Sequence, residues 1–488
     1  MVPEIALTPQ TLERFRARYG DRIAVFHSGL SLGQRMDEWK RVRKGDALIA
    51  IGTRSAVFAP FENLGLIVMD EEQEYTYKSE STPRYHARNV ARFRCAWHKA
   101  PLLLASATPS VESYYMATEG GRYQLEQLTQ RYGTARLPTV DTIDISEQKL
   151  SESIFSPQLR QAIEYNLQNG YQSILLHNRR GFNTFVACRA CGHVLTCEQC
   201  SVSMTYHLDS RKLLCHYCGR SMPFAVKCPD CGSEQLRYAG QGTQRAEDEL
   251  SRLFPDARVL RMDADSTQQK FSHADKLAAF ERGDYDIMIG TQMVAKGLDF
   301  ERVTLVGVML ADQMLYSDDF RSYERAFSLL TQVVGRSGRG EYSGRAIIQT
   351  MTPENPVIAM AAAQDYQEFY KNEIAVRRAM LYPPFSDICM VGFVGIYEDV
   401  VRNMALCFME MLRQRAEQDY PGLPLRVLGP SPAAVNRIKG KYRFRLIIKC
   451  RNSADFRRLL STLLCDIGQM KQFGKATAFA DMNPDNIM

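Results

Sequence analysis

The stretch Gly283-Asp-Tyr-Asp-Ile-Met-Ile-Gly-Thr291 repeats an earlier stretch, Gly45-Asp-Ala-Leu-Ile-Ala-Ile-Gly-Thr53, at the same spacing. In both copies a Gly-Asp pair precedes a short apolar run that ends in Gly-Thr. Apolar runs of this length, bounded by glycine, are typical of buried β-strands. The repeat therefore predicts that one strand-based unit occurs twice in the chain.

Matching segments flank both copies in the same order. A strand and a helix-like stretch precede each copy, and two further strands follow it. These strands are expected at Ile23–Phe26, Leu66–Met69 and Leu102–Ala105 in the first half, and at Arg258–Leu260, Leu305–Leu310 and Ala346–Gln349 in the second. Short apolar strands that alternate with helices predict two α/β lobes on parallel sheets, which bind ligands at the carboxyl ends of their strands.

The second half has one strand more than the first. It opens with Ile174-Leu-Leu176, which runs into Asn178-Arg-Arg-Gly181, and no counterpart precedes Met1-Val-Pro-Glu4, so we expect an incomplete first lobe. Beyond Leu381-Tyr-Pro-Pro-Phe385 the pattern changes to an expected α+β tail. We expect a partial first lobe at residues 1–145, a second lobe at 146–365 and a C-terminal α+β domain at 366–488.

Eight cysteines in four Cys-x-x-Cys pairs lie within the second half. Eight thiolates at this spacing predict two structural Zn²⁺ sites in an insertion at residues 186–234. The loop lengths favour an inner site of Cys197, Cys200, Cys215 and Cys218. The outer site then consists of Cys188, Cys191, Cys228 and Cys231.

Bulk composition is that of an ordinary globular chain. The 488 residues are 45% hydrophobic and 24% charged, which suits two to four domains, and the net charge of +6 is weak evidence for a polyanion partner. No apolar run approaches the ~20 residues of a membrane span, so no membrane partner is expected. Thirteen cysteines without a secretory signal favour metal over disulfides or a redox dithiol, in a reducing, cytoplasmic compartment.

Two charged groups suit nucleotide hydrolysis. Asp70-Glu-Glu72 follows an apolar strand, where Asp70 is placed to hold Mg²⁺ and Glu71 to deprotonate a water. Gln332-Val-Val-Gly-Arg-Ser-Gly-Arg339 places Arg336 and Arg339 among glycines, and arginines there reach phosphates bidentately. The alternatives are a solvated acidic strand end and an ordinary basic turn.

In this order the residues resemble superfamily 2 helicases, which implies RecA-like lobes. Ser106-Ala-Thr108 resembles motif III, Gly290-Thr-Gln292 through Lys296-Gly297 resembles motif V, and Arg336 and Arg339 resemble motif VI. The chain is more similar still to the primosomal protein N′ (PriA) family of bacterial replication-restart helicases. This resemblance covers essentially the whole chain and rests on Val2-Pro-Glu-Ile-Ala-Leu-Thr-Pro-Gln10, Ile51-Gly-Thr-Arg-Ser55, Asn178-Arg-Arg-Gly-Phe182, the eight cysteines, and Ile289-Gly-Thr-Gln-Met-Val-Ala-Lys-Gly297.

The resemblance implies an ATP-driven 3′→5′ DNA helicase that recognises stalled forks and helps to reload the replicative helicase. Its implied partners are branched and single-stranded DNA, other primosome proteins, single-strand-binding protein and the replicative helicase loader. The implied cofactors are two structural Zn²⁺ and ATP with Mg²⁺. Residues expected to couple the nucleotide to the lobes are Ser106, Thr108, Gly297 and Gln332.

The sequence departs from this family in two places. It contains no Gly-x-x-x-x-Gly-Lys-Ser/Thr loop, which holds the β- and γ-phosphates, so we expect little ATP hydrolysis by this chain alone. Gln73 stands where the family commonly carries histidine. A non-catalytic DNA- or primosome-binding fragment of the same fold is the alternative function, and a zinc-ribbon nucleic-acid-binding protein without a motor is a third.

Candidate DNA contacts lie on strand-end loops and on one C-terminal strand. In the loops they are Thr53, Arg54, Ser55, Thr291 and Gln292, whose polar groups suit phosphates, with ordinary loop capping as the alternative. Farther along, Lys441, Arg443 and Arg445 alternate with Tyr442, Phe444 and Leu446. This period of two predicts a basic face opposite a buried one, which suits a DNA backbone, although a solvated edge strand fits equally well.

Overall fold

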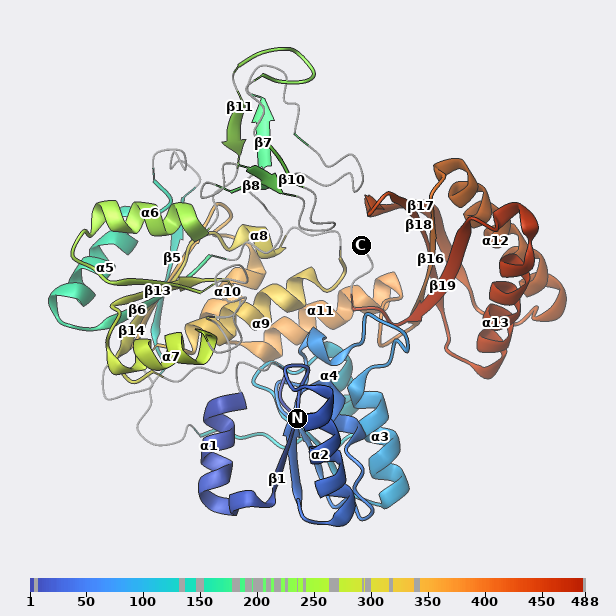
Figure 1. The fold of residues 1–488 in the computed structure, drawn as a ribbon, viewed down its shortest axis with the longest axis horizontal. Coiled ribbons are helices and arrows are strands. Elements are labelled where there is room, and N and C mark those ends of the chain that lie inside the picture. Colours follow the sequence, from blue (N-terminus) through green and yellow to red (C-terminus); the bar gives the residue numbers. More distant parts are fainter. Residues whose placement is uncertain are drawn as a thin grey trace. The chain divides into compact units, whose positions relative to one another are not determined.

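The computed structural model describes residues 1–3, 8–130, 137–145, 153–177, 185–188, 195, 205–207, 212–214, 221–223, 227–234, 236–239, 243–262, 272–291, 294, 300–315, 319–337 and 343–485. It divides into two compact units. The first contains Met1–Asn178, Thr243–Ser317 and Arg321–Ile374, and the second contains Arg179–Gly242, Asp318–Phe320 and Ala375–Met488. Figure 1 labels the helices and most of the strands.

A six-stranded, wholly parallel sheet forms the second lobe, with the strand order β12-β13-β6-β14-β15-β5. The strands are β5 (Thr139–Asp144), β6 (Gln172–Leu176), β12 (Val259–Met262), β13 (Ile287–Gly290), β14 (Val303–Val308) and β15 (Arg345–Thr350). Three of them, β6, β13 and β14, are buried along their whole length. Parallel strands covered on both faces have continuous apolar sequences, which is why the sequence pattern predicted them.

Helices cover both faces of this sheet. On one face α5 (Pro157–Gln168) and α6 (Thr243–Leu253) pack through Leu159 and Leu250 against Leu175 and Ile289, and Figure 1 draws α7 (Ser272–Arg282) on the other side. The start of α5 is fixed by Ser156, whose hydroxyl accepts from the backbone N–H of Leu159, and by proline at the first helical position. The remaining helices of this lobe are α8 (Asp312–Leu315), α9 (Ser322–Val334) and α10 (Pro356–Ala363), and α11 (Tyr366–Met380) follows.

Two parallel strand pairs form the first lobe: β1 (Ile23–Phe26) with β2 (Ile49–Gly52), and β3 (Ile67–Met69) with β4 (Leu102–Leu104). Residues 1–3 connect the pairs, because the Val2 N–H donates to Gly52 O at 2.9 Å and the Asp70 N–H to Met1 O at 3.0 Å. The helices are α1 (Thr8–Tyr19), α2 (Leu32–Lys44), α3 (Ala87–His98) and α4 (Val111–Thr118).

The sequence repeat corresponds to one geometry that occurs in both lobes. Gly52 lies opposite Phe26 on the neighbouring parallel strand, and Gly290 lies opposite Met262 in the same way. A Cβ atom would fall 2.0 Å from Phe26 O at Gly52, and 2.3 Å from Met262 O at Gly290. Glycine is required at both positions because a backbone carbonyl occupies the space of a side chain.

The second unit contains two antiparallel sheets. Between β6 and α6, residues 185–239 form β7 (Phe185–Cys188), β8 (Thr205–His207), β9 (Lys212–Leu214), β10 (Ser221–Pro223) and β11 (Leu236–Ala239), in the order β10-β9-β8-β7-β11. The C-terminal sheet has the order β17-β18-β16-β19 and consists of β16 (Asp387–Gly395), β17 (Arg426–Ile438), β18 (Lys441–Cys450) and β19 (Ala476–Met482). One face of it is covered by α12 (Glu398–Asp419) and α13 (Ala454–Gln469), whose Phe408 and Phe456 pack against Phe393 and Leu446.

Two expectations about position are corrected by strand pairing. The boundary expected at residue 145 places β5 in the first lobe, whereas β5 pairs with β15 along its whole length in the sheet of the second lobe. The edge-strand alternative for Lys441–Cys450 is wrong, because β18 is hydrogen-bonded on one side to β17 and on the other to β16. The other domain boundaries remain predictions.

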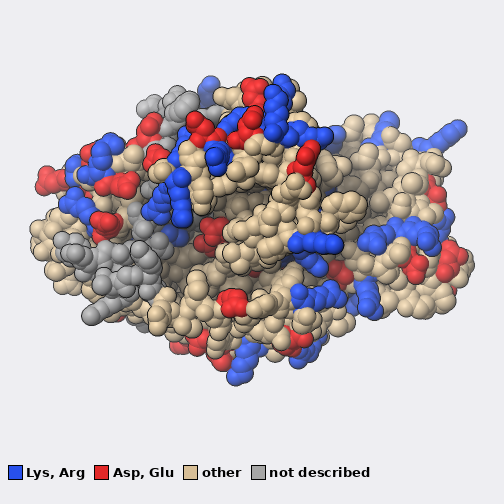
Figure 2. All heavy atoms as spheres, turned by 90° about the horizontal axis from the view of Figure 1, so that it is seen from below, with Lys and Arg blue, Asp and Glu red and all other residues tan. Residues whose placement is uncertain are grey.

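Surface charge is mixed. On the face drawn in Figure 2, Lys and Arg side chains lie in several separate groups with Asp and Glu among them, so the net charge of +6 does not form one basic surface there. Within the part of the chain that the structure describes, no helix has both the length and the apolarity needed to span a membrane.

Candidate functional site

Asp70 and Glu71 lie where β3 ends, as the sequence predicts. Asp70 is exposed, and its Oδ1 accepts a hydrogen bond from the Glu71 backbone N–H at 3.1 Å. Glu71 has a positive φ of 47°, an uncommon backbone conformation for a residue other than glycine and one that is found at functional turns. An exposed carboxylate at the end of a parallel strand offers the hard oxygen ligands that Mg²⁺ prefers.

The Glu71 carboxylate receives amide hydrogen bonds from both lobes. Gln73 Nε2 donates to Glu71 Oε2 at 2.7 Å, and Gln332 Nε2, on α9 of the second lobe, donates to the same oxygen at 3.0 Å. The structure thus brings together Glu71 and Gln332, which are 261 residues apart in the sequence. Gln73, at the position where histidine was expected, also accepts from Ser106 Oγ at 2.5 Å and so bridges the two motifs.

The loop of residues 106–109 contacts the second lobe. The backbone N–H of Thr108 donates to Ser106 Oγ at 3.0 Å, and the hydroxyls of Thr108 and Ser328 lie 2.8 Å apart. Thr108 is buried, at 2% exposure. Both predicted coupling residues of this loop therefore make polar contacts at the place where the two lobes meet.

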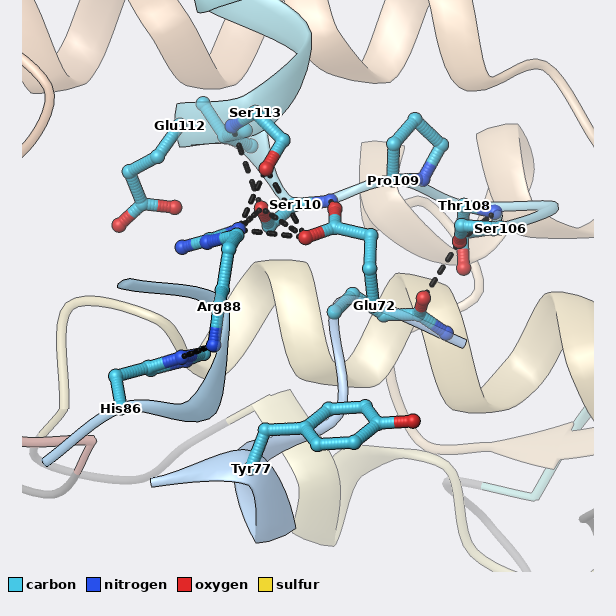
Figure 3. Close-up of polar contacts among 12 residues, drawn as sticks. Glu72, Tyr77, His86, Arg88, Ser106, Thr108, Pro109, Ser110, Glu112 and Ser113 are labelled. Atoms are coloured by element: carbon cyan, nitrogen blue, oxygen red, sulfur yellow. Dashed lines mark hydrogen bonds and ion pairs between the residues drawn. The ribbon is translucent and has the colours of Figure 1, made fainter. Parts of the chain in front are cut away.

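Sequence reasoning missed a buried ion pair directly beside this loop (Figure 3). Arg88 Nη1, on α3, donates to Glu72 Oε2 at 2.5 Å, and the two side chains are 18% and 1% exposed. Glu72 also accepts from the Ser110 backbone N–H at 2.7 Å and from the Ser113 hydroxyl at 3.0 Å. Burial alone would lower the pKa of Arg88, but the carboxylates of Glu72 and Glu112 reverse the effect and raise it. Ser110-x-x-Ser113 resembles a helix N-cap pattern, yet nothing in the sequence marks Arg88 as the partner of Glu72.

His86, two residues before Arg88, caps α3 in its neutral form. Its Nδ1 accepts from the Arg88 backbone N–H at 3.2 Å, which requires an unprotonated nitrogen. Burial, followed by the nearby charges of Arg88 and Lys78, lowers the pKa of His86 well below its usual value.

The predicted arginines of the second lobe are only partly within the described residues. Arg336 follows α9 and is 7% exposed, with its backbone N–H donating to Val333 O at 3.0 Å. Arg339, Gly297 and Gln292 lie outside the described residues.

The predicted DNA contacts in the lobes differ in accessibility. The guanidinium of Arg54 donates to the backbone carbonyls of Thr76 and Lys78, and it lies over the Tyr85 ring. Thr291 is 7% exposed, whereas Ser55 is exposed. A DNA role for Arg54 and Thr291 therefore requires rearrangement of these contacts, and Ser55 is accessible as it stands.

The alternation along β18 is confirmed on its apolar side. Phe444 and Leu446 are buried in the core beneath α12 and α13, and Lys441 is exposed. Arg443 and Arg445, on the opposite face from that core, are partly exposed. Lys449 shares their face but is buried, and its Nζ donates to Met380 O at 2.6 Å.

Three of the eight predicted zinc ligands, Cys188, Cys228 and Cys231, lie within the described residues, and the others lie outside them. Cys228 is buried and begins a tight turn, in which its backbone N–H donates to Ser233 O at 2.8 Å and Gly232 N–H donates back to Cys228 O at 2.9 Å. Gly232 has a φ of +72°, which suits glycine. A tight turn that contains both cysteines of a Cys-x-x-Cys pair is the backbone arrangement expected for half of a zinc site.

Four family models match the chain. They describe a DEAD/DEAH box helicase at residues 1–116, a helicase conserved C-terminal domain at 236–341, the PriA DNA helicase Cys-rich region (CRR) domain at 197–223, and the primosomal protein N C-terminal domain at 378–484. The first two matches fall on the two lobes, the third on the cysteine-rich insertion and the fourth on the C-terminal sheet.

Curated relatives match along nearly the whole chain. The replication restart protein PriA of Bacillus subtilis is 44% identical over 490 residues, which is 100% of this chain and 60% of that protein. The proteins of the same name from Treponema pallidum and Rickettsia felis are 40% and 37% identical, each over 92% of this chain, and 67% and 68% of their own lengths are covered. The chain spans about 60% of the length of the Bacillus subtilis relative. With two RecA-like helicase lobes, a cysteine-rich zinc ribbon and the matching C-terminal domain, the chain belongs to the PriA family of replication restart proteins.

Proposed function

We propose that this chain forms the motor core of an ATP-dependent 3′→5′ DNA helicase that acts in replication restart on branched and single-stranded DNA. One observation supports this most directly: Glu71 of the first lobe accepts a hydrogen bond from Gln332 of the second. A carboxylate held between two lobes changes its surroundings whenever the lobes move, which is the requirement for coupling hydrolysis to movement along DNA.

Each residue of the proposed centre has one task. Asp70 holds Mg²⁺, Glu71 orients and deprotonates the attacking water, and Arg336 and Arg339 stabilise charge on the phosphates. Mg²⁺, when bound with ATP, neutralises charge that develops on the phosphoryl oxygens. The sequence contains no Gly-x-x-x-x-Gly-Lys-Ser/Thr loop, so we expect the hydrolysis of ATP by this chain alone to stay near background.

The insertion is proposed to hold two structural Zn²⁺ ions, and the strand register supports the proposed ligand sets. β8 and β9 are antiparallel with Thr205 opposite Leu214, and in the sequence Cys200 precedes Thr205 and Cys215 follows Leu214. Cys188 lies opposite Leu236 at the start of β11, and the turn with Cys228 and Cys231 precedes that strand. These pairings favour the inner and outer sets predicted from loop lengths.

The test of the motor is ATP hydrolysis and nucleotide binding by the purified chain, with and without single-stranded DNA. We expect weak binding of a fluorescent ATP analogue, which Arg336→Ala abolishes, and hydrolysis near background in both conditions. DNA-stimulated hydrolysis that survives Glu71→Gln would contradict the role of Glu71. A complete lack of nucleotide binding would favour the alternative, a DNA- or primosome-binding fragment without catalysis.

The C-terminal sheet is proposed to follow a DNA backbone through Lys441, Arg443 and Arg445. Exchange of all three for glutamate should weaken binding to a forked DNA and flatten its salt dependence, because fewer counterions are released from the phosphates. Fluorescence anisotropy across a salt series measures both effects. A matched control is Arg413→Glu with Arg458→Glu, two exposed cations on α12 and α13. An equal loss of affinity in the control would contradict the proposal that the basic residues of β18 bind the DNA backbone.

A further inference from the structure

Helix α4 of the first lobe contacts α9 of the second lobe through two partly buried polar interactions. The backbone N–H of Val111 donates to Glu324 Oε1 at 2.8 Å. Arg321 Nη2 donates to Glu112 Oε1 at 2.8 Å, and these two side chains are only 14% and 18% exposed. Polar pairs with so little access to water are weakly screened, so they tie the two helices together more firmly than surface pairs do.

The same helix contacts α11 through aromatic rings. Tyr114 lies edge-on against Tyr366 and Tyr370, with ring centroids 5.1 and 4.6 Å apart. The Tyr366 hydroxyl donates to Pro109 O at 2.7 Å, and the Tyr370 hydroxyl donates to Glu119 Oε1 at 3.0 Å. Burial, with the neighbouring carboxylate, raises the pKa of Tyr370 to about 12, so this hydroxyl keeps its proton at neutral pH. Helix α4 is therefore joined at one end to α9 and along one side to α11.

The Glu72 carboxylate is hydrogen-bonded to the first turn of α4, as Figure 3 shows. Its carboxylate accepts from the Ser110 N–H, the Ser110 hydroxyl at 3.3 Å and the Ser113 hydroxyl, while Arg88 on α3 neutralises its charge. Glu72 also follows Glu71 directly in the chain. A shift of the Glu71 backbone therefore moves the Glu72 carboxylate, which is hydrogen-bonded to α3 and to the start of α4. Because protein interiors are closely packed, the neighbouring helices move with it.

We propose that Glu72 is a positioning residue that transmits the geometry of the loop of residues 70–73, through α4, to α9 and α11. This route runs beside the Ser106–Thr108 loop and does not use it. It deepens the proposed function, because it assigns to a residue next to the proposed general base the task of linking the first lobe to the second. The link itself requires no nucleotide, so it can be measured whether or not the chain hydrolyses ATP.

The test compares backbone amide hydrogen exchange in the full chain and in variants. Glu72→Gln keeps the shape of the side chain but removes the charge that pairs with Arg88. We expect the amides of α4, the first turns of α9 and the first turns of α11 to exchange at least about a hundredfold faster, because the variant leaves the buried Arg88 guanidinium without its carboxylate. Exchange in β6, β13 and β14 should not change, because those strands belong to the core of the second lobe.

Two controls separate this role from a general loosening of the first lobe. Val57→Ala creates a cavity at a buried residue of the same lobe, away from α4, and should leave the exchange of α9 unaltered. Glu324→Ala together with Arg321→Ala removes both polar contacts of α9 with α4 at the far end of the route. If Glu72 acts through α4, adding Glu72→Gln to this double variant should not accelerate α9 further.

Three outcomes would overturn the proposal: unchanged exchange of α9 in Glu72→Gln, equal acceleration by Val57→Ala, or additive effects when Glu72→Gln is added to the double variant. Circular dichroism and zinc content establish that each variant is folded. A failure here, with the binding of the ATP analogue still dependent on Arg336, would reject the route and leave the proposed helicase function standing.

Discussion

At the scale of single residues, the centre depends on charges that are buried and must be matched. Glu72 is acceptable at 1% side-chain exposure only because Arg88 and three donors around Ser110 and Ser113 satisfy its oxygens. Removing one partner of such a pair leaves an uncompensated charge, which costs about 3–5 kcal/mol. The same environment acts on His86, because burial, followed by the nearby charges of Arg88 and Lys78, lowers its pKa and keeps it neutral.

The neutral state of His86 predicts a pH dependence of stability. Its pKa is lower in the folded than in the unfolded protein, so below about pH 6.5 the unfolded chain binds more protons and the free energy of unfolding falls, by at most about 1.4 kcal/mol per pH unit. His86→Asn keeps a helix-capping side chain but cannot titrate. The stability lost between pH 7.5 and 5.5 should therefore be smaller in the variant.

Urea unfolding followed by tryptophan fluorescence measures the stability of the first lobe, which contains His86. The two tryptophans, Trp39 and Trp97, lie on α2 and α3 of the first lobe. An identical pH profile for His86→Asn and the natural chain would show that His86 does not carry the dependence.

At the scale of elements, the repeated unit requires glycine as the last residue of β2 and of β13, directly before the turn that follows each strand. Thr53 N–H donates to Phe26 O, and Ala56 N–H donates to Thr53 O, so the chain turns immediately after β2. The second lobe has the same arrangement, with Thr291 N–H donating to Met262 O. The carbonyl oxygen that accepts the hydrogen bond of the turn, Phe26 O or Met262 O, occupies the space where a Cβ atom of Gly52 or Gly290 would lie. A larger residue at either glycine would therefore clash with the backbone of the neighbouring strand.

Gly52→Ala should therefore destabilise the first lobe by about 3 kcal/mol or more, because a backbone carbonyl cannot move aside as a side chain can. Gly65→Ala is the matched control in the same lobe, since a Cβ atom there meets nothing within 4 Å. It should change stability by less than about 1 kcal/mol. Tryptophan-detected urea unfolding compares the two variants, and equal effects would refute the carbonyl argument.

At the scale of the whole molecule, the chain combines units with different sources of stability. The second lobe has a parallel sheet in which three strands are buried along their whole length, whereas the described strands of the insertion have three or four residues each. Such short strands bury little apolar surface, and structural zinc supplies about 10–16 kcal/mol per site, which is comparable to the whole stability of a domain.

The purified chain should contain two Zn²⁺ per molecule by elemental analysis. Cys228→Ser and Cys200→Ser should each lose one ion, because they belong to different proposed sites, and Cys465→Ser on α13 should lose none. Chelation should leave the tryptophan fluorescence of the first lobe unchanged. One ion per chain, or the loss of both ions in either single variant, would reject the two-site assignment.

The sequence alone predicted every described strand of the two lobes except β5, together with the insertion, an α+β C-terminal tail with a strand from Lys441, and the carboxylate pair at Asp70 and Glu71. These features depend on local patterns: apolar runs, glycine next to a neighbouring strand, and cysteine spacing all act over a few residues. The boundary expected at residue 145 was wrong because nothing in the short sequence of β5 ties this strand to one lobe, and only its pairing with β15 places it in the second.

The tertiary structure alone decided which distant residues meet. Gln332 reaches Glu71 across 261 residues, Ser328 meets Thr108 across 220, and Arg88 neutralises Glu72 inside the first lobe. No local pattern specifies such pairs, because the sequence does not distinguish the true partner from any other polar residue on the same face of the helix. Only burial selects the partner, since a charge removed from water must be paired and a hydroxyl removed from water must be hydrogen-bonded.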